Sequence, residues 1–458
     1  MEIQRLEVKN FGPINEAVIE LKPLLVLIGP QASGKSTVAK LIYFFQQLPL
    51  EFFTRFYQSD RDYMDMTQDL IVPIREKFYD YFGSTFHLPD FSIVFHYSEG
   101  HTLTLSLTAA KKIEAHFSDD FFTKQSRKEL KRQKTALLRI KKETEEDITG
   151  SRKLILDERQ LSCLHALNDT INDIFCNEHN DQLFILAGRN ATVGYSETFE
   201  DMLRESIQRS IETQGRRAYN SKEQTIDETI MLSFMQRVVK LRQNFINLGN
   251  FEGMIAHANR ELKPELILAN ELVKKVIKGQ YSNSEYGERI VHKGGGYVYL
   301  KNASSGQQES IRILQDAFLS IYQGNKLLRI VEEPEAHIYP EAQMSTIQLL
   351  VLMLNHCESN NLILTTHSPY TLTIINNLIC AARAGSVDAA GVNKIVSKSL
   401  WLPVERVAAY RLSDGKSEDI IDRETGEMKA EMIDEVSGVI SEQYYQMSNL
   451  EGMASDED

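Results

Sequence analysis

The sequence contains the segment Gly29-Pro30-Gln31-Ala32-Ser33-Gly34-Lys35-Ser36-Thr37, which follows an apolar run from Leu24 to Ile28 and precedes an amphipathic run from Val38 to Leu48. A Gly-x-x-x-x-Gly-Lys-Ser pattern between a strand and a helix is typical of a loop that binds phosphate. Its glycines let consecutive backbone N–H groups turn towards an anion, and the following helix adds its positive N-terminal end. The pattern predicts an α/β nucleotide-binding fold. The alternative is a tight turn without a ligand, which the two flanking patterns make the weaker interpretation.

The side chains of this loop have separate expected roles. Lys35 would reach the outer phosphates of a nucleotide. The Ser36 hydroxyl would contact Mg²⁺, which keeps most of its own waters and needs few protein oxygens. The expected nucleotide-binding residues are Gly29, Ser33, Gly34, Lys35, Ser36 and Thr37.

The composition is that of an acidic protein. The chain has 458 residues, with 51 Lys and Arg against 64 Asp and Glu, so the formal net charge is −13. This charge does not indicate attraction of the whole protein to nucleic acid, although a local basic face remains possible. The cysteines form no Cys-x-x-Cys pair, so they make neither a disulfide framework nor a zinc motif. Because no run is long enough to span a bilayer, we expect a cytoplasmic protein without a membrane partner.

Patterns along the chain indicate five parts. Alternating strands flank Gly12-Pro13, a second hairpin is expected about Glu99-Gly100, and a buried-strand pattern from Asp181 to Ala187 is expected to re-enter the sheet. The expected parts are an N-terminal part of the head (1–110), a helical hairpin or short coiled coil (111–180), a strand with a helical subdomain (181–294), a C-terminal part of the head (295–400), and a strand hairpin with a last helix and an acidic tail (401–458).

Two segments leave alternatives open. Residues 50–90 place many Phe and Tyr side chains among arginines, which fits either base stacking or a satellite core under the sheet, and the core is the simpler account. Residues 124–142 are a predicted helix with a thin apolar seam and a basic cluster. The cluster is Lys124, Arg127, Lys128, Lys131, Arg132, Lys134, Arg139, Lys141 and Lys142. It is either a solvated helix face balanced by nearby acids or a contact for a phosphate backbone.

Three later motifs place polar residues at the ends of predicted elements. The segment 303–308 opens a helix and fits either an anion site or a plain N-cap. The strand 327–331 ends in Glu332 and Glu333, of which the first can hold hydrated Mg²⁺ and the second can deprotonate an attacking water. The strand 362–366 ends at His367, which can donate to a phosphate, although such a histidine alone is more often structural. The carboxyl ends of parallel strands meet at one edge, so we expect these side chains beside the phosphate loop.

The order of these motifs resembles that of ABC-type ATPases of the SMC-like branch, which carry Walker A, a signature motif, Walker B and a His-switch. The resemblance covers residues 1–50 and 295–375. It implies an ABC/SMC-like head with a mixed and parallel sheet, ATP and Mg²⁺ as cofactors, Glu332 as the acid on the Mg²⁺ side, Glu333 as the catalytic base and His367 as the switch histidine. It also implies a head-to-head homodimer, in which each signature completes the ATP site of the opposite subunit. The signature residues are Ser304, Ser305, Gly306 and Gln307.

The sequence departs from this family's pattern at three places. Glu332 stands where Walker B usually has Asp, and its extra methylene would slow hydrolysis or shift a Mg²⁺-bound water. The signature begins with Ala303 and has Ser305 in place of Gly. No glutamine is identified as that of the Q-loop.

A closer resemblance is to stand-alone ATPases whose Walker B reads Glu-Glu-Pro-Glu-Ala-His, here residues 332–337. The segment 185–189 and the ending 407–426 are similar as well. These proteins include the ATPase halves of overcoming-lysogenisation-defect nucleases and ATPase subunits of the Septu, PARIS and retron-linked anti-phage systems. The resemblance implies an ATP-dependent subunit that scaffolds or regulates a separately encoded effector, a nuclease in bacterial anti-phage defence. The residues after the His-switch are too few for a fused Toprim nuclease, so we expect the effector on another chain.

Two other functions are compatible with parts of the sequence. A DNA-repair or chromosome-maintenance ATPase would bind duplex DNA directly through the basic residues 124–142. A chain that itself cuts nucleic acid would use acids such as Asp60 and Asp62, but the grouped carboxylates of a two-metal site are lacking.

Overall fold

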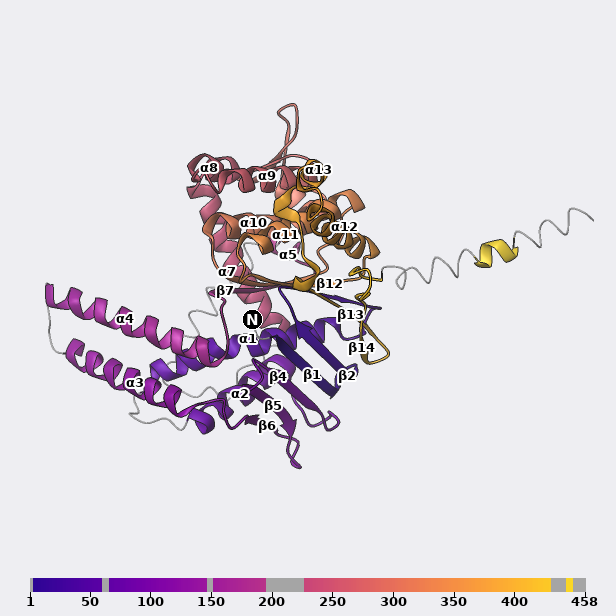
Figure 1. Ribbon diagram of the computed structural model, residues 1–458. Helices are drawn as coiled ribbons and strands as arrows, with labels where there is room; N and C mark the ends of the chain where they lie inside the picture. Colours follow the sequence, from indigo (N-terminus) through magenta and orange to yellow (C-terminus); the bar gives the residue numbers. More distant parts are fainter. Residues whose placement is uncertain (1–2, 60–65, 146–150, 195–225, 430–441, 448–458) are drawn as a thin grey trace, which may run out of the picture.

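The computed structural model describes residues 3–59, 66–145, 151–194, 226–429 and 442–447 (Figure 1). Within them, an 11-stranded sheet has the order β6-β5-β4-β1-β2-β14-β13-β3-β12-β11-β7. Its strands are β1 (Gln4–Phe11), β2 (Ile14–Leu21), β3 (Leu24–Ile28), β4 (Ser92–His96), β5 (Thr102–Leu107), β6 (Ile113–Phe117), β7 (Asp181–Ile185), β11 (Leu327–Glu332), β12 (Asn361–Thr366), β13 (Val407–Ser413) and β14 (Lys416–Asp419).

The sheet is antiparallel on one side and parallel on the other. Strands β6, β5, β4, β1 and β2 pair antiparallel in succession, whereas β13, β3, β12, β11 and β7 all run parallel. All five residues of β3 are buried, and alternate residues enter two different hydrophobic cores. A strand buried on both faces reads as a continuous apolar run, which is the pattern of Leu24–Ile28.

Helices cover both faces of the parallel part (Figure 1). Helix α1 (Lys35–Gln58) and α2 (Met66–Phe82) pack in the core that also holds the antiparallel strands. The opposite core holds the helices that follow β7. They are α7 (Ile226–Asn247), α8 (Asn250–His257), α9 (Lys263–Ile277), α10 (Ser305–Gln323), α11 (Pro340–His356) and α12 (Pro369–Gly385), with the short α5 (Ala191–Gly194) and the 3-10 turns η1 (Leu300–Asn302), η2 (Lys398–Leu400) and η3 (Val404–Arg406). The short helix α13 (Ala389–Ile395) follows α12 and has no buried residue. These layers meet the expectation of an α/β head with a mixed and parallel sheet, and that prediction is confirmed.

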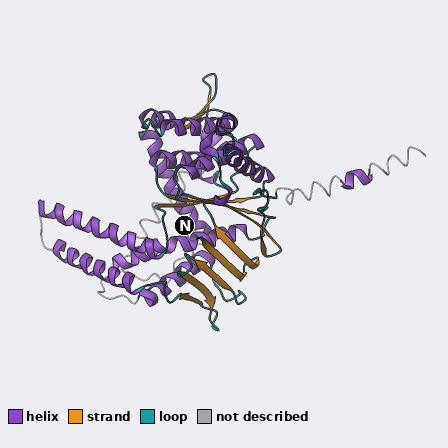
Figure 2. Ribbon diagram, viewed as in Figure 1, coloured by secondary structure: helices purple, strands orange, loops and turns teal. Residues whose placement is uncertain are grey.

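Two helices leave the body side by side, as Figures 1 and 2 show. They are α3 (Lys124–Glu145) and α4 (Ser151–Ile174), which match the predicted helical hairpin. Strand β6 precedes them and pairs with β5 in the large sheet, so the helical pair begins at Lys124 and not at residue 111. The division into five parts stays a prediction.

The pair is anchored by a lysine that the sequence analysis counted with the basic face. Lys134 is 2% exposed, and its Nζ donates to the backbone carbonyls of Phe56 and Ser59 at the end of α1. The prediction that Lys134 lies on the basic face is therefore wrong, because a helix C-terminus offers unpaired carbonyls that a cation can satisfy. The other basic residues of the cluster are exposed.

Most aromatic residues of segment 50–90 that the structure describes form core, whereas Tyr57 and Phe86 are exposed. Phe52, Phe56 and Phe78 are buried, and Arg55 pairs with Glu51 on the same helix. The interpretation as a satellite core is confirmed, and Arg61 lies outside the described residues. No helix in the described part of the chain is both long and apolar enough to cross a membrane.

A second sheet of three antiparallel strands precedes α10. It consists of β8 (Gln280–Ser284), β9 (Gly287–Val291) and β10 (Tyr297–Tyr299), in the order β10-β9-β8.

Candidate nucleotide-binding site

The phosphate loop joins β3 to α1, as the sequence predicts. Gly34 precedes the helix with a φ of 104°, a conformation that suits glycine. A Cβ on Gly29 would lie 2.0 Å from the carbonyl oxygen of Leu412, so β13 packs directly against the loop. The Nζ of Lys35 donates to the carbonyls of Gly29 and Pro30, both at 2.8 Å. The loop therefore curls around its own lysine, with the N-terminus of α1 beneath it.

Lys35 is 5% exposed and lies among carboxylates. Burial lowers the pKa of Lys35 from 10.5 to about 8, against the opposing charges of Glu333, Glu335 and Glu332. Three acids that act on one lysine lie close to it, although they are some 300 positions away in the sequence. The parallel order β3-β12-β11 brings them to the same edge of the sheet.

Glu332 is the last residue of β11 and is 7% exposed. Its Oε2 accepts a long hydrogen bond of 3.4 Å from the backbone N–H of Ala187, and its Oε1 is buried without a partner. The hydroxyl of Ser33 is also buried without a partner, while Ser36 is exposed at the start of α1. Buried acceptors without partners are uncommon and call for a ligand or water. Their chemistry fits hydrated Mg²⁺, which takes one or two protein oxygens and otherwise waters and phosphates.

Glu333 and His367 face each other at the mouth of this site. The Oε1 of Glu333 lies 3.5 Å from Nε2 of His367, and both side chains are partly exposed. Glu333 has a φ of 44°, which is uncommon for a residue with a side chain. Its backbone N–H donates to Thr365 on β12 at 2.9 Å, which keeps the turn next to the histidine.

Arg189 holds the backbone of the two acids from behind. This side chain is fully buried after β7, and it donates to the carbonyls of Glu332 at 2.8 Å and Glu333 at 2.9 Å. It also donates to the carbonyls of Leu186 and Glu309. The sequence analysis noted Arg189 only as part of a family resemblance, and the structure shows that it fixes the turn after β11.

Glu335 was missed as a functional candidate. Its Oε1 accepts from Oγ1 of Thr366 at 2.6 Å and from the backbone N–H of His367 at 2.8 Å. Further along the same segment, Gln343 on α11 accepts from the hydroxyl of Ser368 at 2.8 Å. Glu332, Glu333 and Glu335 are close together in the sequence, and this grouping of acids could have indicated that Glu335 also belongs to the site. Residues 335 and 343 thus hold the end of β12 at two points.

The predicted signature begins α10. Ser304 is the N-cap, and its side chain and that of Gln307 form a capping box. Ser304 and Ser305 are exposed, whereas Gly306 is buried so tightly that a Cβ would lie 2.5 Å from the carbonyl oxygen of His337. The plain N-cap geometry is therefore present, and the exposed hydroxyls leave the anion-binding role open.

A family model described as an AAA ATPase domain matches residues 1–372. The chain belongs to the AAA ATPase domain family. No curated protein matches the chain. Among solved structures, the recombination mediator protein RecF-ATPrS in the RecFOR pathway is similar with 10% identity, a TM-score of 0.32, and coverage of 91% of this chain and 98% of that chain. Membership of the AAA ATPase domain family supports nucleotide binding and ATPase activity in general.

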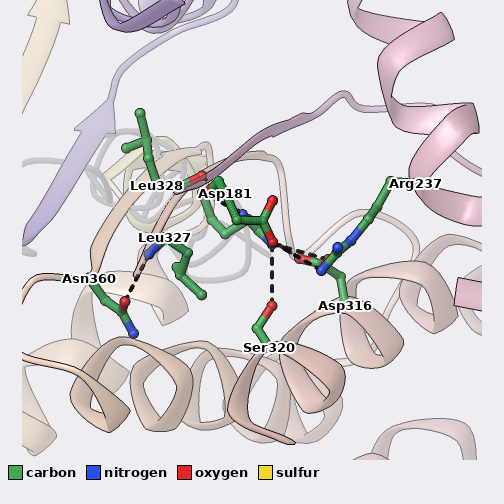
Figure 3. Close-up of polar contacts among 8 residues, drawn as sticks. Asp181, Arg237, Asp316, Ser320, Leu327, Leu328 and Asn360 are labelled. Carbon is green, nitrogen blue, oxygen red and sulfur yellow. Dashed lines mark hydrogen bonds and ion pairs between the residues drawn. The ribbon is translucent and has the colours of Figure 1, made fainter. Parts of the chain in front are cut away.

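A buried ion-pair network connects β11 with α10 in this AAA ATPase domain (Figure 3). Arg329 on β11 is fully buried, and its Nε lies 2.6 Å from Oδ2 of Asp316 on α10. Asp181, Arg237, Asp316 and Ser320 meet at this point. Burial alone would raise the pKa of Asp316, but the charges of Arg329 and Arg237 outweigh it, so the pKa lies below its ordinary value. The strand that bears Glu332 and the helix that begins at the predicted signature are therefore tied together.

Among the residues that the structure describes, no group of three or more His, Cys, Asp or Glu side chains is arranged to hold a metal ion. Asp60 and Asp62, the acids weighed for a nuclease, lie outside the described residues.

Proposed function

We propose that this AAA ATPase domain binds ATP with Mg²⁺ at residues 29–37, hydrolyses it, and uses the nucleotide to control a separately encoded effector. The observation that carries the ATPase proposal is the meeting of Glu333 and His367 at the edge of the sheet that also bears Lys35. Glu333 follows β11, His367 follows β12, and Lys35 follows the loop after β3. A merely structural ion pair would not require the unusual backbone of Glu333.

Each side chain has a defined task in hydrolysis. Lys35 would pair with the outer phosphates, and Ser36 and Glu332 would hold the hydrated Mg²⁺. When bound, Mg²⁺ neutralises charge on the phosphate oxygens. Glu333 would accept a proton from the attacking water. The water oxygen would bond to the γ-phosphorus while the bond between the γ-phosphorus and the β–γ bridging oxygen breaks. His367 would donate to the γ-phosphate from the opposite side of the same space.

A second subunit would complete the site. The hydroxyls of Ser304 and Ser305 and the N-terminus of α10 offer donors for an anion. Their exposure supports a head-to-head dimer, in which each signature contacts the ATP of the other chain. ATP would then favour the dimer because it binds that state more tightly.

The effector proposal rests on sequence resemblance. The segment 332–337 has the Glu-Glu-Pro-Glu-Ala-His pattern of stand-alone ATPases in anti-phage systems. The effector would be a nuclease on another chain, active in bacterial anti-phage defence. Co-expression with the neighbouring genes and native mass measurement, with and without ATP, tests this proposal. Retention of a nuclease-sized partner that changes with ATP or with Glu333→Gln supports it, and a chain that purifies alone under all conditions contradicts it.

A second candidate is an ATPase that binds duplex DNA through α3. Lys128, Lys131 and Arg132 are exposed on this projecting helix, although Arg132 is paired with Glu129 at 2.6 Å. Duplex DNA that stimulates hydrolysis with a steep salt dependence would favour this function.

A further inference from the structure

The exposed side of the small sheet β8-β9-β10 carries three tyrosines around one arginine. Tyr286, Tyr297 and Tyr299 are 68%, 52% and 38% exposed. The guanidinium of Arg289 lies 4.8 Å from the ring centroid of Tyr297 and 5.9 Å from that of Tyr286. The rings of Tyr297 and Tyr299 meet edge to face at 5.6 Å. We call these four residues the tyrosine-arginine face.

The sheet is two-sided, which explains why these rings are not core. Tyr281 and Ile290 are fully buried against the helices of the second core. Because side chains alternate along a strand, the neighbours of the buried residues point to the other side. Tyr297 and Tyr299 are two apart on β10, and Tyr299 is opposite Arg289 on β9. Arg289, Tyr297 and Tyr299 thus share one side of the sheet, and Tyr286 joins them from the turn between β8 and β9.

Two lysines and a histidine adjoin this face in an otherwise acidic protein. His292 and Lys293 lie in the turn between β9 and β10, and Lys301 follows β10, all three exposed. The exposed acid in residues 280–302 is Glu285. The turn contains Gly294 and Gly295 with φ of 115° and 89°, conformations that suit glycine, and the N–H of Gly295 donates to the carbonyl of His292 within the turn.

We propose that the tyrosine-arginine face binds single-stranded nucleic acid, with bases stacked on the tyrosines and phosphates on the surrounding cations. Open aromatic rings beside a basic track are the elements of sequence-tolerant binding of single strands. A stacked guanidinium adds a second flat surface for a base. Duplex DNA would fit less well because its bases are already stacked and paired, so the rings could reach only its edges.

Other features of the patch favour nucleic acid over a protein partner. Protein interfaces are enriched in Tyr and Arg but depleted in Lys, so the lysines are the distinguishing feature of this patch. Here the exposed large hydrophobic side chains of residues 280–302 are the tyrosines, Arg289 lies against two of them, and the exposed Lys293 and Lys301 flank β10 in the sequence. The inference does not depend on ATP hydrolysis, and it concerns a different surface from the basic residues of α3.

The test measures binding of the full chain to a fluorescein-labelled oligothymidylate of about 16 nucleotides by fluorescence anisotropy. We expect Tyr297→Ala to weaken binding about tenfold, because a base loses the aromatic ring on which it stacks. Tyr297→Phe keeps the ring and is expected to bind like the wild type. Arg289→Ala is expected to weaken binding and to reduce its salt dependence between about 50 and 200 mM salt.

The controls separate this face from α3 and from misfolding. Lys128→Ala with Lys131→Ala removes exposed charge from α3 and is expected to leave oligothymidylate binding unchanged. Tyr297 is half exposed, so thermal unfolding of Tyr297→Ala is expected to match that of the wild type. The proposal is overturned if the wild type does not bind oligothymidylate, if a duplex of the same length binds as tightly, or if Tyr297→Ala binds like Tyr297→Phe. Loss of a copurifying effector in Tyr297→Ala, with oligothymidylate binding intact, also overturns it in favour of a protein partner.

Discussion

The imidazole Nε2 of His367 lies 3.5 Å from the carboxylate oxygen Oε1 of Glu333, at the ends of two neighbouring parallel strands. The hydrogen bond from the Glu333 backbone to Thr365 maintains this separation, and both side chains remain open to solvent. A carboxylate near a histidine in a partly exposed place can accept a proton from water while the imidazole contacts an anion.

Glu333→Gln is expected to abolish most hydrolysis while ATP still binds, because the amide keeps the shape of the side chain and cannot accept the proton. General base catalysis contributes typically about 10²–10⁴-fold, so the rate of phosphate release should fall by about that factor. Glu341→Gln is the matched control, since this acid forms an exposed pair with Lys278 at the start of α11. Equal rates in Glu333→Gln and the wild type, with normal ATP binding, would remove Glu333 from the mechanism.

Glu335→Ala is expected to lower kcat about tenfold with little change in KM for ATP. The substitution removes the acceptor that holds Thr366 and the backbone of His367, so the imidazole loses its fixed place, whereas Glu335 itself is assigned no contact to the nucleotide. A buried donor without a partner costs about 1–3 kcal/mol, which corresponds to a factor of this size.

Glu335→Gln keeps an acceptor oxygen and is expected to retain more activity than Glu335→Ala. Gln343→Ala releases Ser368 and should show the same split between kcat and KM in a weaker form. A change in the pH profile of kcat in Glu335→Ala is the readout that a purely structural role would not produce. A proportional loss of ATP binding in Glu335→Ala would show that the residue does not act through His367.

ATP affinity is expected to fall as the pH rises through 8. Burial lowers the pKa of Lys35 from 10.5 to about 8, so the free protein carries a neutral lysine above that pH. Phosphate binding favours the charged form, and the protein must therefore take up a proton when ATP binds above pH 8. Well above this pH the dissociation constant should rise by up to about tenfold per pH unit, because a single proton is taken up.

Isothermal titration calorimetry in buffers of different ionisation enthalpy measures this proton uptake directly. Lys35→Met is expected to bind ATP weakly at every pH and to lose the dependence near pH 8. An affinity of the wild type that is constant from pH 7 to pH 9.5 would contradict a lowered pKa for Lys35.

Arg189→Met is expected to lower the free energy of unfolding by about 3–5 kcal/mol, since removal of one partner leaves a buried charge and buried carbonyls unsatisfied. Arg189 is fully buried, its Nε lies 3.5 Å from Oε2 of Glu309, and it donates to four backbone carbonyls. Urea denaturation monitored by circular dichroism measures the change. Arg132→Met is the surface control, because its exposed pair with Glu129 should contribute about 1 kcal/mol or less. A similar small change in both variants would mean that Arg189 does not hold the turn after β11.

The local chemistry of the site was readable in the sequence. The Gly-x-x-x-x-Gly-Lys-Ser pattern between Leu24–Ile28 and the next helix required a phosphate loop, because few other local structures demand glycine at both places and a lysine beside them. Apolar runs ending in Glu332 and in His367 likewise predicted strands with polar ends, and both strands are present. These features depend on residues that are near one another in the chain, so the local sequence pattern was sufficient to predict them.

The tertiary structure decided what depends on contacts between distant segments. Lys134 looked like its exposed basic neighbours, and only the packing of α3 against the end of α1 shows that it is buried. Glu335 looked like one more acid in a turn, and its role appears only when the pairing of β11 with β12 brings it to His367. The tyrosine-arginine face required the register of β9 with β10, which sets Tyr299 opposite Arg289 and leaves the rings on the outer side. Hydrophobic periodicity specifies which residues are buried within an element, whereas strand order and register specify which side chains from different elements meet.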